Sequence, residues 1–117
     1  KERNINIISC MGTGNKMDPT AFKVSDIYNT KICPLAKVMR YELRKRSVKE
    51  LKVVYSEETP LKPKLEEVIT CKEGCVCTGG SKKCSHKRQI PGSISFVPPV
   101  AGMIMAGEII KDILKLK

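Results

Sequence analysis

The chain has 117 residues, with 22 Lys and Arg against 12 Asp and Glu, so its formal net charge is +10. Recurrent runs of Leu and β-branched residues argue against disorder, and 8 Gly and 7 Pro are too few for a collagen-like or low-complexity chain. The most apolar stretch, residues 97–107, is about half as long as the roughly 20 residues that a membrane span needs. No signal peptide opens the chain, which favours a cytoplasmic protein with reduced thiols.

The first half of the chain predicts two strands and a helix. Residues 5–10 form a short β-branched run that is typical of a buried strand, and a glycine-rich turn follows at residues 12–15. Apolar and polar residues alternate over residues 21–27, which predicts a second strand. Apolar side chains at helical spacing follow Pro34, and proline is favoured at the first position of a helix. We therefore expect a helix over residues 34–46.

The second half predicts two more strands, a long loop and a closing helix. Residues 51–56 are expected to form the third strand and residues 93–97 the fourth. Residues 71–89 hold four cysteines and show almost no apolar periodicity, which is typical of a functional or disordered loop. A wide apolar face predicts a helix over residues 100–116.

These elements predict an α/β fold with a mixed sheet of about four strands, two main helices and a long cysteine-rich loop. Helices are expected to cover both faces of a sheet that contains parallel strands, and this set leaves at least one face bare. We therefore interpret residues 1–117 as a single partial domain with a loop-rich insertion at residues 57–90. An N-terminal half of the same protein or a second copy of the chain would cover the bare face.

The positive charge is concentrated in two segments. Residues 37–52 hold seven basic and two acidic residues, and residues 82–88 hold four basic and no acidic residues. Such clusters favour a polyanionic partner, although a solvated helix face and a solvated loop remain an equal alternative.

A nucleotide-binding motif is suggested by Gly12 and Gly14, which follow a strand. The third glycine of a dinucleotide fingerprint is replaced by Met17, and Asp18 and Pro19 follow where a helix should begin. No Walker A sequence is present either. The chain therefore holds no complete nucleotide site of its own.

The only cysteine cluster has the ligand types of a zinc site but not the usual spacing. Its members fall within fourteen residues: Cys71, Cys75, Cys77 and Cys84. Structural zinc sites normally use two separated ligand pairs, so the spacing favours a redox-labile loop over a metal centre.

Five segments resemble the ThiF/MoeB/HesA superfamily and, within it, the tRNA threonylcarbamoyladenosine dehydratase branch. The likeness covers nearly the whole chain. The segments are ISCMGTGNKMDPT (8–20), PLAKVMRYELR (34–44), VVYSEE (53–58), PGSISFVP (91–98) and PVAGMIMAGEIIK (99–111). ThiF and MoeB hold zinc with two separated cysteine pairs, which this chain does not copy.

The resemblance implies the C-terminal portion of a Rossmann-like adenylating domain. Family members activate a carboxylate with ATP and Mg²⁺, and the dehydratase branch closes the threonylcarbamoyl group of tRNA into a ring. The ATP loop and the metal-binding acid of the family lie in the N-terminal half, so no catalytic residue is assigned here and the chain alone is expected to be inactive. The family implies a homodimer. Gly12, Gly14, Asn15 and Asp18 lie past the carboxyl end of a predicted strand, where open α/β sheets bind their ligands, so we expect them in a loop next to the nucleotide and substrate.

A tRNA substrate gives the basic clusters a partner. The tRNA-facing residues expected on this basis are Arg40, Arg44, Lys45, Lys82, Lys83, Lys87 and Arg88. Two other functions stay open. The chain could belong to an activator of a ubiquitin-like or sulfur-carrier protein that uses a loop cysteine, with a sulfur-transfer protein as partner. It could also be a non-catalytic basic module for RNA binding or dimerisation.

Overall fold

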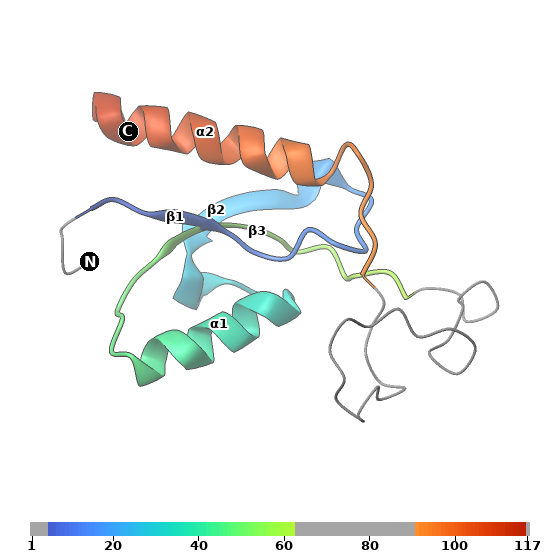
Figure 1. Cartoon of the computed structure of the whole chain (residues 1–117), viewed down its shortest axis with the longest axis horizontal. Coiled ribbons are helices and arrows are strands. Elements are labelled where there is room, and N and C mark those ends of the chain that lie inside the picture. Colours follow the sequence, from blue (N-terminus) through green and yellow to red (C-terminus); the bar gives the residue numbers. More distant parts are fainter. Residues whose placement is uncertain (1–4, 63–90, 117) are drawn as a thin grey trace, which may run out of the picture.

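The computed structural model describes residues 5–62 and 91–116 as a sheet between two helices (Figure 1). Helix α2 lies on one face of the sheet and helix α1 on the other. The helices and strands are β1 (Ile8–Cys10), β2 (Phe22–Asp26), α1 (Pro34–Lys45), β3 (Lys52–Ser56) and α2 (Pro98–Leu114), with short 3₁₀ helices η1 (Pro19–Ala21) and η2 (Ile27–Asn29). No helix in the described ranges is both long enough and apolar enough to span a membrane.

The sheet is mixed and has the strand order β1-β3-β2. Strand β1 runs parallel to β3, with Ser9 opposite Val53, and β2 runs antiparallel to β3, with Val24 opposite Val54. The parallel pair needs a long crossover because both strands run in the same direction, and β2 and α1 provide it. The central strand is therefore the last of the three in the chain.

The core lies on both sides of β3, because successive side chains of a strand point to opposite faces. Val53 and Tyr55 join the cluster that packs against α1, together with Met11, Ile27 and Ala36 of the surrounding elements. Val54 and Ser56 alternate with these residues along the strand, so their side chains point to the opposite face of the sheet, where both are fully buried. Helix α2 contacts both β1 and β3. The β-branched run of β3 is thus explained by burial on both faces.

The predicted fourth strand at residues 93–97 is wrong, and the described sheet has three strands rather than about four. Residues 91–94 have no regular structure, and a tight turn at residues 95–96 follows. The Val97 N–H donates to the Ile94 carbonyl at 3.2 Å, which closes the turn. Pro98 and Pro99 follow, and their rings remove the next two backbone donors that a strand would need.

The other predicted elements are confirmed in type, with shifted ends. Helix α1 begins at Pro34 as expected and ends at Lys45, and β3 begins one residue later than expected. Strand β1 begins at Ile8, so Ile5 and Ile7 lie before it and are more than half exposed. Helix α2 begins at Pro98 rather than at residue 100 and ends at Leu114. The α/β class with two main helices is therefore confirmed.

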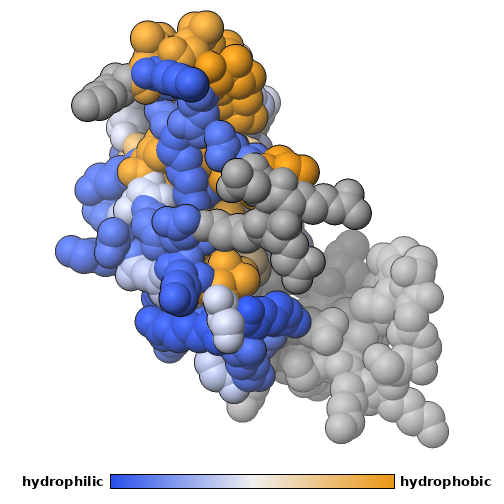
Figure 2. All heavy atoms as spheres, turned by 90° about the vertical axis from the view of Figure 1, so that its left-hand side faces the viewer, coloured by the Kyte–Doolittle hydropathy of each residue, from blue (hydrophilic) through white to orange (hydrophobic). Residues whose placement is uncertain are grey.

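Helix α2 exposes apolar side chains on the side away from the sheet. Only Ala101 of the helix is buried, whereas Met103 and Ile113 are more than 70% exposed. Figure 2 shows hydrophobic surface gathered at the end of the molecule where α2 finishes. Single exposed apolar residues are ordinary, but a contiguous group of this kind marks a surface that another chain or segment contacts.

An ion-pair cluster joins the end of α2 to the first residue of β3. The Lys52 ammonium lies 2.8 Å from an Asp112 carboxylate oxygen and 2.9 Å from a Glu108 carboxylate oxygen. The hydrogen bonds to Asp112 and then Glu108 raise the pKa of Lys52, and those from Lys111 and then Lys52 lower the pKa of Glu108. Glu108 contributes stability above its unfolded pKa that is lost as pH falls, and Lys52 contributes stability that is lost as pH rises through its raised pKa.

We predict that Lys52→Met lowers the urea midpoint of the chain only in the window where both charges exist. The difference from the parent chain should be largest between about pH 5 and 10 and should shrink on either side of that window. Lys49→Met is the matched control, because it removes the same charge from an exposed position in the irregular segment between α1 and β3. A Lys52→Met difference that stayed constant from pH 3 to pH 8 (about one unit below the usual carboxyl pKa to well above it) would contradict this assignment.

Candidate functional site

The loop after β1, residues 11–18, lies at the carboxyl ends of the two parallel strands. In open α/β sheets ligands bind at that edge. The Met11 N–H donates to the Val54 carbonyl at 2.8 Å, which continues the pairing with β3 by one residue. Lys16 is buried, and its ammonium donates to the Gly12 carbonyl at 2.8 Å and the Ser56 carbonyl at 3.4 Å. The ammonium thereby ties the loop to the end of the central strand.

Asn15 connects the loop to two segments that are distant in the sequence. Its N–H donates to the Gly92 carbonyl at 2.7 Å, and its side-chain oxygen accepts from the Gly92 N–H at 2.7 Å. Its carbonyl accepts from the Leu61 N–H at 2.6 Å. Asn15 has φ 55°, a left-handed conformation that Asn adopts more readily than most residues. The residues on either side of the 63–90 segment therefore both bind to this one loop position.

Gly14 is favoured by the same close approach. A Cβ at Gly14 would lie 3.3 Å from the Gly92 carbonyl oxygen, which is tighter than an ordinary contact. At Gly12 a Cβ would meet the Cys33 sulfur and the Leu35 Cβ at 3.7 Å, which is ordinary van der Waals distance. The two glycines therefore have different roles, and Gly14 is the one that lets segment 91–94 approach.

Asp18 is a turn-forming residue in this structure. Its carboxylate oxygen accepts from the Thr20 hydroxyl at 2.5 Å and from the Thr20 N–H at 2.8 Å, which caps η1. The hydroxyl bond and then the backbone bond lower the pKa of Asp18. Glu58 follows β3, and its two carboxylate oxygens accept from the N–H groups of Met17 and Asp18 at 2.8 and 2.9 Å.

Two open cavities border the loop. One, of about 470 Å³, lies where the loop meets residues 61–62 and 91–94 and has Asn15, Lys16 and Met17 in its wall. The second, of about 140 Å³, has Gly12, Gly14, Lys16, Cys33, Pro34, Leu35 and Pro60 in its wall. The second cavity joins the predicted glycine positions to the N-terminus of α1, where backbone N–H groups favour an anion.

The two cysteines of the described ranges lie close to this loop. Cys33 is buried and precedes Pro34 at the start of α1, and Cys10 ends β1. Burial raises the pKa of the Cys10 thiol, the neighbouring Cys33 raises it further, and the Lys16 ammonium opposes both. Burial thus favours the protonated form of Cys10, which is a poor nucleophile.

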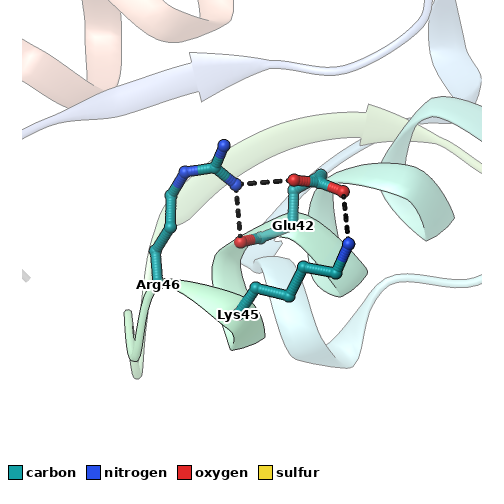
Figure 3. Close-up of polar contacts among 3 residues, drawn as sticks. All are labelled: Glu42, Lys45 and Arg46. Atoms are coloured by element: carbon teal, nitrogen blue, oxygen red, sulfur yellow. Dashed lines mark hydrogen bonds and ion pairs between the residues drawn. The ribbon is translucent and has the colours of Figure 1, made fainter.

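The basic residues of α1 are engaged to different degrees. The Arg40 guanidinium donates to the Thr30 carbonyl at 3.0 Å and also to the Thr30 hydroxyl, so it fastens the end of η2 to the helix. The Arg44 guanidinium lies 5.3 Å from the centre of the Tyr28 ring. Figure 3 shows Glu42 between Lys45 and Arg46, with ion pairs of 3.5 and 2.6 Å. Arg40 therefore has a structural partner, whereas Arg44 and Lys45 are exposed.

Several predicted site residues lie outside the described residues. They are the four cysteines of the thiol cluster and the basic residues Lys82, Lys83, Lys87 and Arg88. Within residues 5–62 and 91–116 no group of three or more His, Cys, Asp or Glu side chains could hold a metal ion.

Comparison with known proteins gives the chain its relatives. The tRNA threonylcarbamoyladenosine dehydratase of Bacillus subtilis is 39% identical over 115 residues, which is 97% of this chain and 43% of that enzyme. The tRNA threonylcarbamoyladenosine dehydratase 1 of Saccharomyces cerevisiae is 36% identical over 67 residues, which is 56% of this chain and 15% of that protein. This chain is homologous to the tRNA threonylcarbamoyladenosine dehydratases.

The resemblance seen in the sequence is thereby confirmed, and the chain spans less than half the length of the curated relatives it matches. No family model matches the chain. The solved structure of TcdA (CsdL) superposes with a TM-score of 0.70 at 22% identity, over 97% of this chain and 42% of that one. The TcdA of E. coli, solved in complex with AMP, superposes with a TM-score of 0.68 at 19% identity, over 97% of this chain and 40% of that chain. These likenesses show that the dehydratase relatives share the fold.

The structure brings the four predicted loop residues together and adds partners that the sequence did not indicate. Gly12, Gly14, Asn15 and Asp18 form one loop at one edge of the sheet, and their roles toward a substrate stay a prediction. Lys16 and Glu58 were missed. Little in the sequence indicated either role, because Lys and Glu are mostly surface residues. Glu58 also lies 40 residues along the chain from the loop residue that it binds.

Proposed function

We propose that this chain is part of an ATP-dependent tRNA threonylcarbamoyladenosine dehydratase. The protein would adenylate the carboxylate of the threonylcarbamoyl group on tRNA with ATP, which releases pyrophosphate. A nucleophilic atom of the same threonylcarbamoyl group would then attack the activated carbonyl, expel AMP and close the ring. The observation that carries the proposal is 39% identity to the Bacillus enzyme over 97% of the chain. The AMP complex of the E. coli relative supports a nucleotide substrate.

The loop of residues 11–18 is the part of this chain that we propose contacts the reacting groups. Lys16 and Glu58 hold its backbone in place from both sides, and Asn15 ties it to residues 61 and 92. A loop held at several points can position a substrate without large motion, which lowers the entropic cost of reaching a reactive geometry. Its contribution would be to orient the substrate and to exclude water beside the second cavity.

Magnesium and the ATP phosphates would be held by residues outside the described ranges. Those ranges contain no group of acidic, histidine or cysteine side chains that fits a metal ion. Magnesium would neutralise phosphate charge during adenylation. No residue named here is assigned to bind it. We keep zinc outside the proposal because the cysteines of residues 71–84, which lie outside the described residues, lack the two separated ligand pairs of a structural zinc site.

We further propose that the exposed apolar face of α2 receives the remaining part of the same protein. Met103, Ile110 and Ile113 are all more than half exposed, and the relatives extend well beyond the matched portion. Strand β1 is an edge strand of the sheet, because β3 is its one partner within the described residues. Its other backbone edge could pair with the remaining part of the protein. A homodimer in the cytoplasm is part of the same proposal.

ATP–pyrophosphate exchange tests the reaction class. Adenylation releases pyrophosphate reversibly, so a protein that joins this chain to its ATP-binding part should exchange labelled pyrophosphate into ATP only when threonylcarbamoyladenosine-containing tRNA is present. Unmodified tRNA is the matched control. Exchange that requires a small carrier protein instead, with a thioester trapped on a cysteine between residues 71 and 84, would replace the dehydratase proposal by the activating-enzyme alternative.

A further inference from the structure

Tyr41 is an exposed aromatic residue that the core does not use. It lies on the outward side of α1, and 58% of its surface is accessible. The other two tyrosines have structural partners: the Tyr28 hydroxyl donates to the Val48 carbonyl, and the Tyr55 hydroxyl donates to Glu57 at 2.8 Å. A single exposed apolar residue is ordinary, so Tyr41 is informative only together with the charged side chains beside it.

Lysines lie one turn before and one turn after this ring. Residues four apart share one face of a helix, so Lys37, Tyr41 and Lys45 form a row, which we call the Tyr41 face. The Lys45 ammonium lies 4.1 Å from the centre of the Tyr41 ring. This cation lies over the ring, and 58% of the Tyr41 surface stays accessible, which leaves ring surface for a second planar group to contact.

The surroundings keep this face positive. Glu42 is the one acidic residue of α1, and its closer partner is Arg46 at 2.6 Å rather than Lys45 at 3.5 Å. Figure 2 shows mostly hydrophilic surface, interrupted by a smaller hydrophobic patch, over the part of the molecule opposite the apolar end of α2. Leu35 and Val38 of the same helix are also exposed. The lysines on both sides of the ring nevertheless suit a dry protein interface poorly, because the core of such an interface is depleted in lysine.

Unpaired nucleotides are the ligand that fits an aromatic ring with lysines on both sides. Stacking on aromatic side chains and contacts between cations and phosphates are the two interactions that hold single-stranded nucleic acid. Bases inside an A-form duplex are stacked and paired, so a protruding ring cannot reach their flat sides. The Tyr41 face therefore favours an RNA loop or bulge over a duplex.

We propose that Tyr41 stacks on an unpaired base of the RNA substrate, while Lys37 and Lys45 bind the phosphates beside it. The inference rests on the proposed function for the identity of the RNA, but its test is independent of catalysis. It also changes the expected set of tRNA contacts. Tyr41 and Lys37 enter the set, and Arg40, which is bound to Thr30, leaves it.

Fluorescence anisotropy of the 117-residue chain tests the inference with two labelled probes. One is a single-stranded RNA of about twelve nucleotides, and the other is a duplex of the same composition. Tyr41→Ala should weaken binding to the single strand about fivefold or more and change duplex binding less than twofold. Tyr41→Phe keeps the ring and should bind like the parent chain.

Salt dependence separates stacking from charge. Lys45→Gln should lower the slope of log affinity against log salt by about one, whereas Tyr41→Ala should leave the slope unchanged. Lys23→Gln on β2 is the charge-matched control, because Lys23 is also exposed but lies on another element. Alanine favours helix, so Tyr41→Ala is not expected to unfold α1, and circular dichroism of each variant checks this.

Three outcomes would overturn the inference: equal binding of the single strand by Tyr41→Ala and the parent chain, equal losses on single strand and duplex, or loss of binding by Tyr41→Phe. A loss of association with the rest of the protein, with RNA binding unchanged, would reassign the face to a protein contact. RNA binding that depends on Tyr41 in a protein that does not dehydrate tRNA would leave this inference standing and refute the proposed function.

Discussion

Replacing Ile27 by alanine is expected to destabilise the chain by about 2–5 kcal/mol, the largest effect of any single truncation proposed here. Ile27 has no exposed surface and belongs to the cluster between the sheet and α1. Its N–H also donates to the Leu51 carbonyl at 2.8 Å, so the backbone around it is fixed and cannot move to fill the space. The free energy of unfolding, measured by urea denaturation, checks the value.

Ile5→Ala is the matched control for this truncation. It removes the same atoms from a side chain that is 60% exposed, and a change within about 0.5 kcal/mol is expected. Equal losses for the two variants would show that Ile27 is not packed as described. A change in tyrosine fluorescence in Ile27→Ala but not in Ile5→Ala would support the assigned position of the cluster, because Tyr28 and Tyr55 both lie at it.

Replacing Asp26 by alanine is expected to cost about 3 kcal/mol. Its two carboxylate oxygens accept from the N–H groups of Tyr28 and Leu51, each at 2.9 Å, and so join the end of β2 to the residue before β3. Each hydrogen bond to a charged group contributes about 1.5–3 kcal/mol, and loss of the acceptor leaves two half-buried donors without it. Urea denaturation of Asp26→Ala at pH 7 measures the loss.

Asp18→Ala is the control for Asp26. Its carboxylate also makes two hydrogen bonds, but both go to the exposed residue Thr20 and cap a single short turn. Water can replace the lost acceptor there, so a clearly smaller loss than for Asp26→Ala is expected. If Asp18→Ala lowered the free energy of unfolding as much as Asp26→Ala does, the hydrogen bonds of Asp26 would not be better shielded from water than those of Asp18, which would contradict the structure.

Local patterns predicted most of the elements correctly because each pattern reflects burial, wholly or in part. The run that includes Val53 and Val54 describes fully buried residues, and Ile27, at the end of the alternation over residues 21–27, is buried too. Val24 in that alternation, and Leu35 and Val38 in the spacing after Pro34, are partly exposed, so those two patterns reflect burial only in part. The same rule failed at residues 93–97. Val97 is buried there as the residue before α2, so an apolar residue at that position did not report a strand.

The order of the strands and the contacts of the loop depend on residues far apart in the chain. No local pattern states that β3 lies between β1 and β2, because the order follows from which faces the helices cover. The bonds between Asn15 and Gly92 cross 77 residues. Gly14 is conspicuous as a glycine in the sequence, but the Gly92 carbonyl that a side chain there would crowd becomes visible only in three dimensions.

Charge patterning located the basic helix but could not rank its members. Arg40 and Lys45 look alike in the sequence, yet one is bound to Thr30 and the other lies over the Tyr41 ring. The difference arises because Arg40 lies toward the core-facing side of α1, beside Ala36, and Lys45 lies on the outward side. Tyr41 was missed for a related reason, since an isolated aromatic residue on a helix is more often part of the core.

Product analysis of modified tRNA tests the central claim most directly. A protein that joins this chain to its ATP-binding part should convert threonylcarbamoyladenosine in tRNA to the cyclic form, with the loss of one water, only when ATP is present. The nucleosides released by digestion are resolved by mass spectrometry, and the ATP-binding part without this chain is the control. Conversion that needs both ATP and this chain is the predicted result. Unchanged threonylcarbamoyladenosine, or equal conversion by the ATP-binding part alone, would contradict the account.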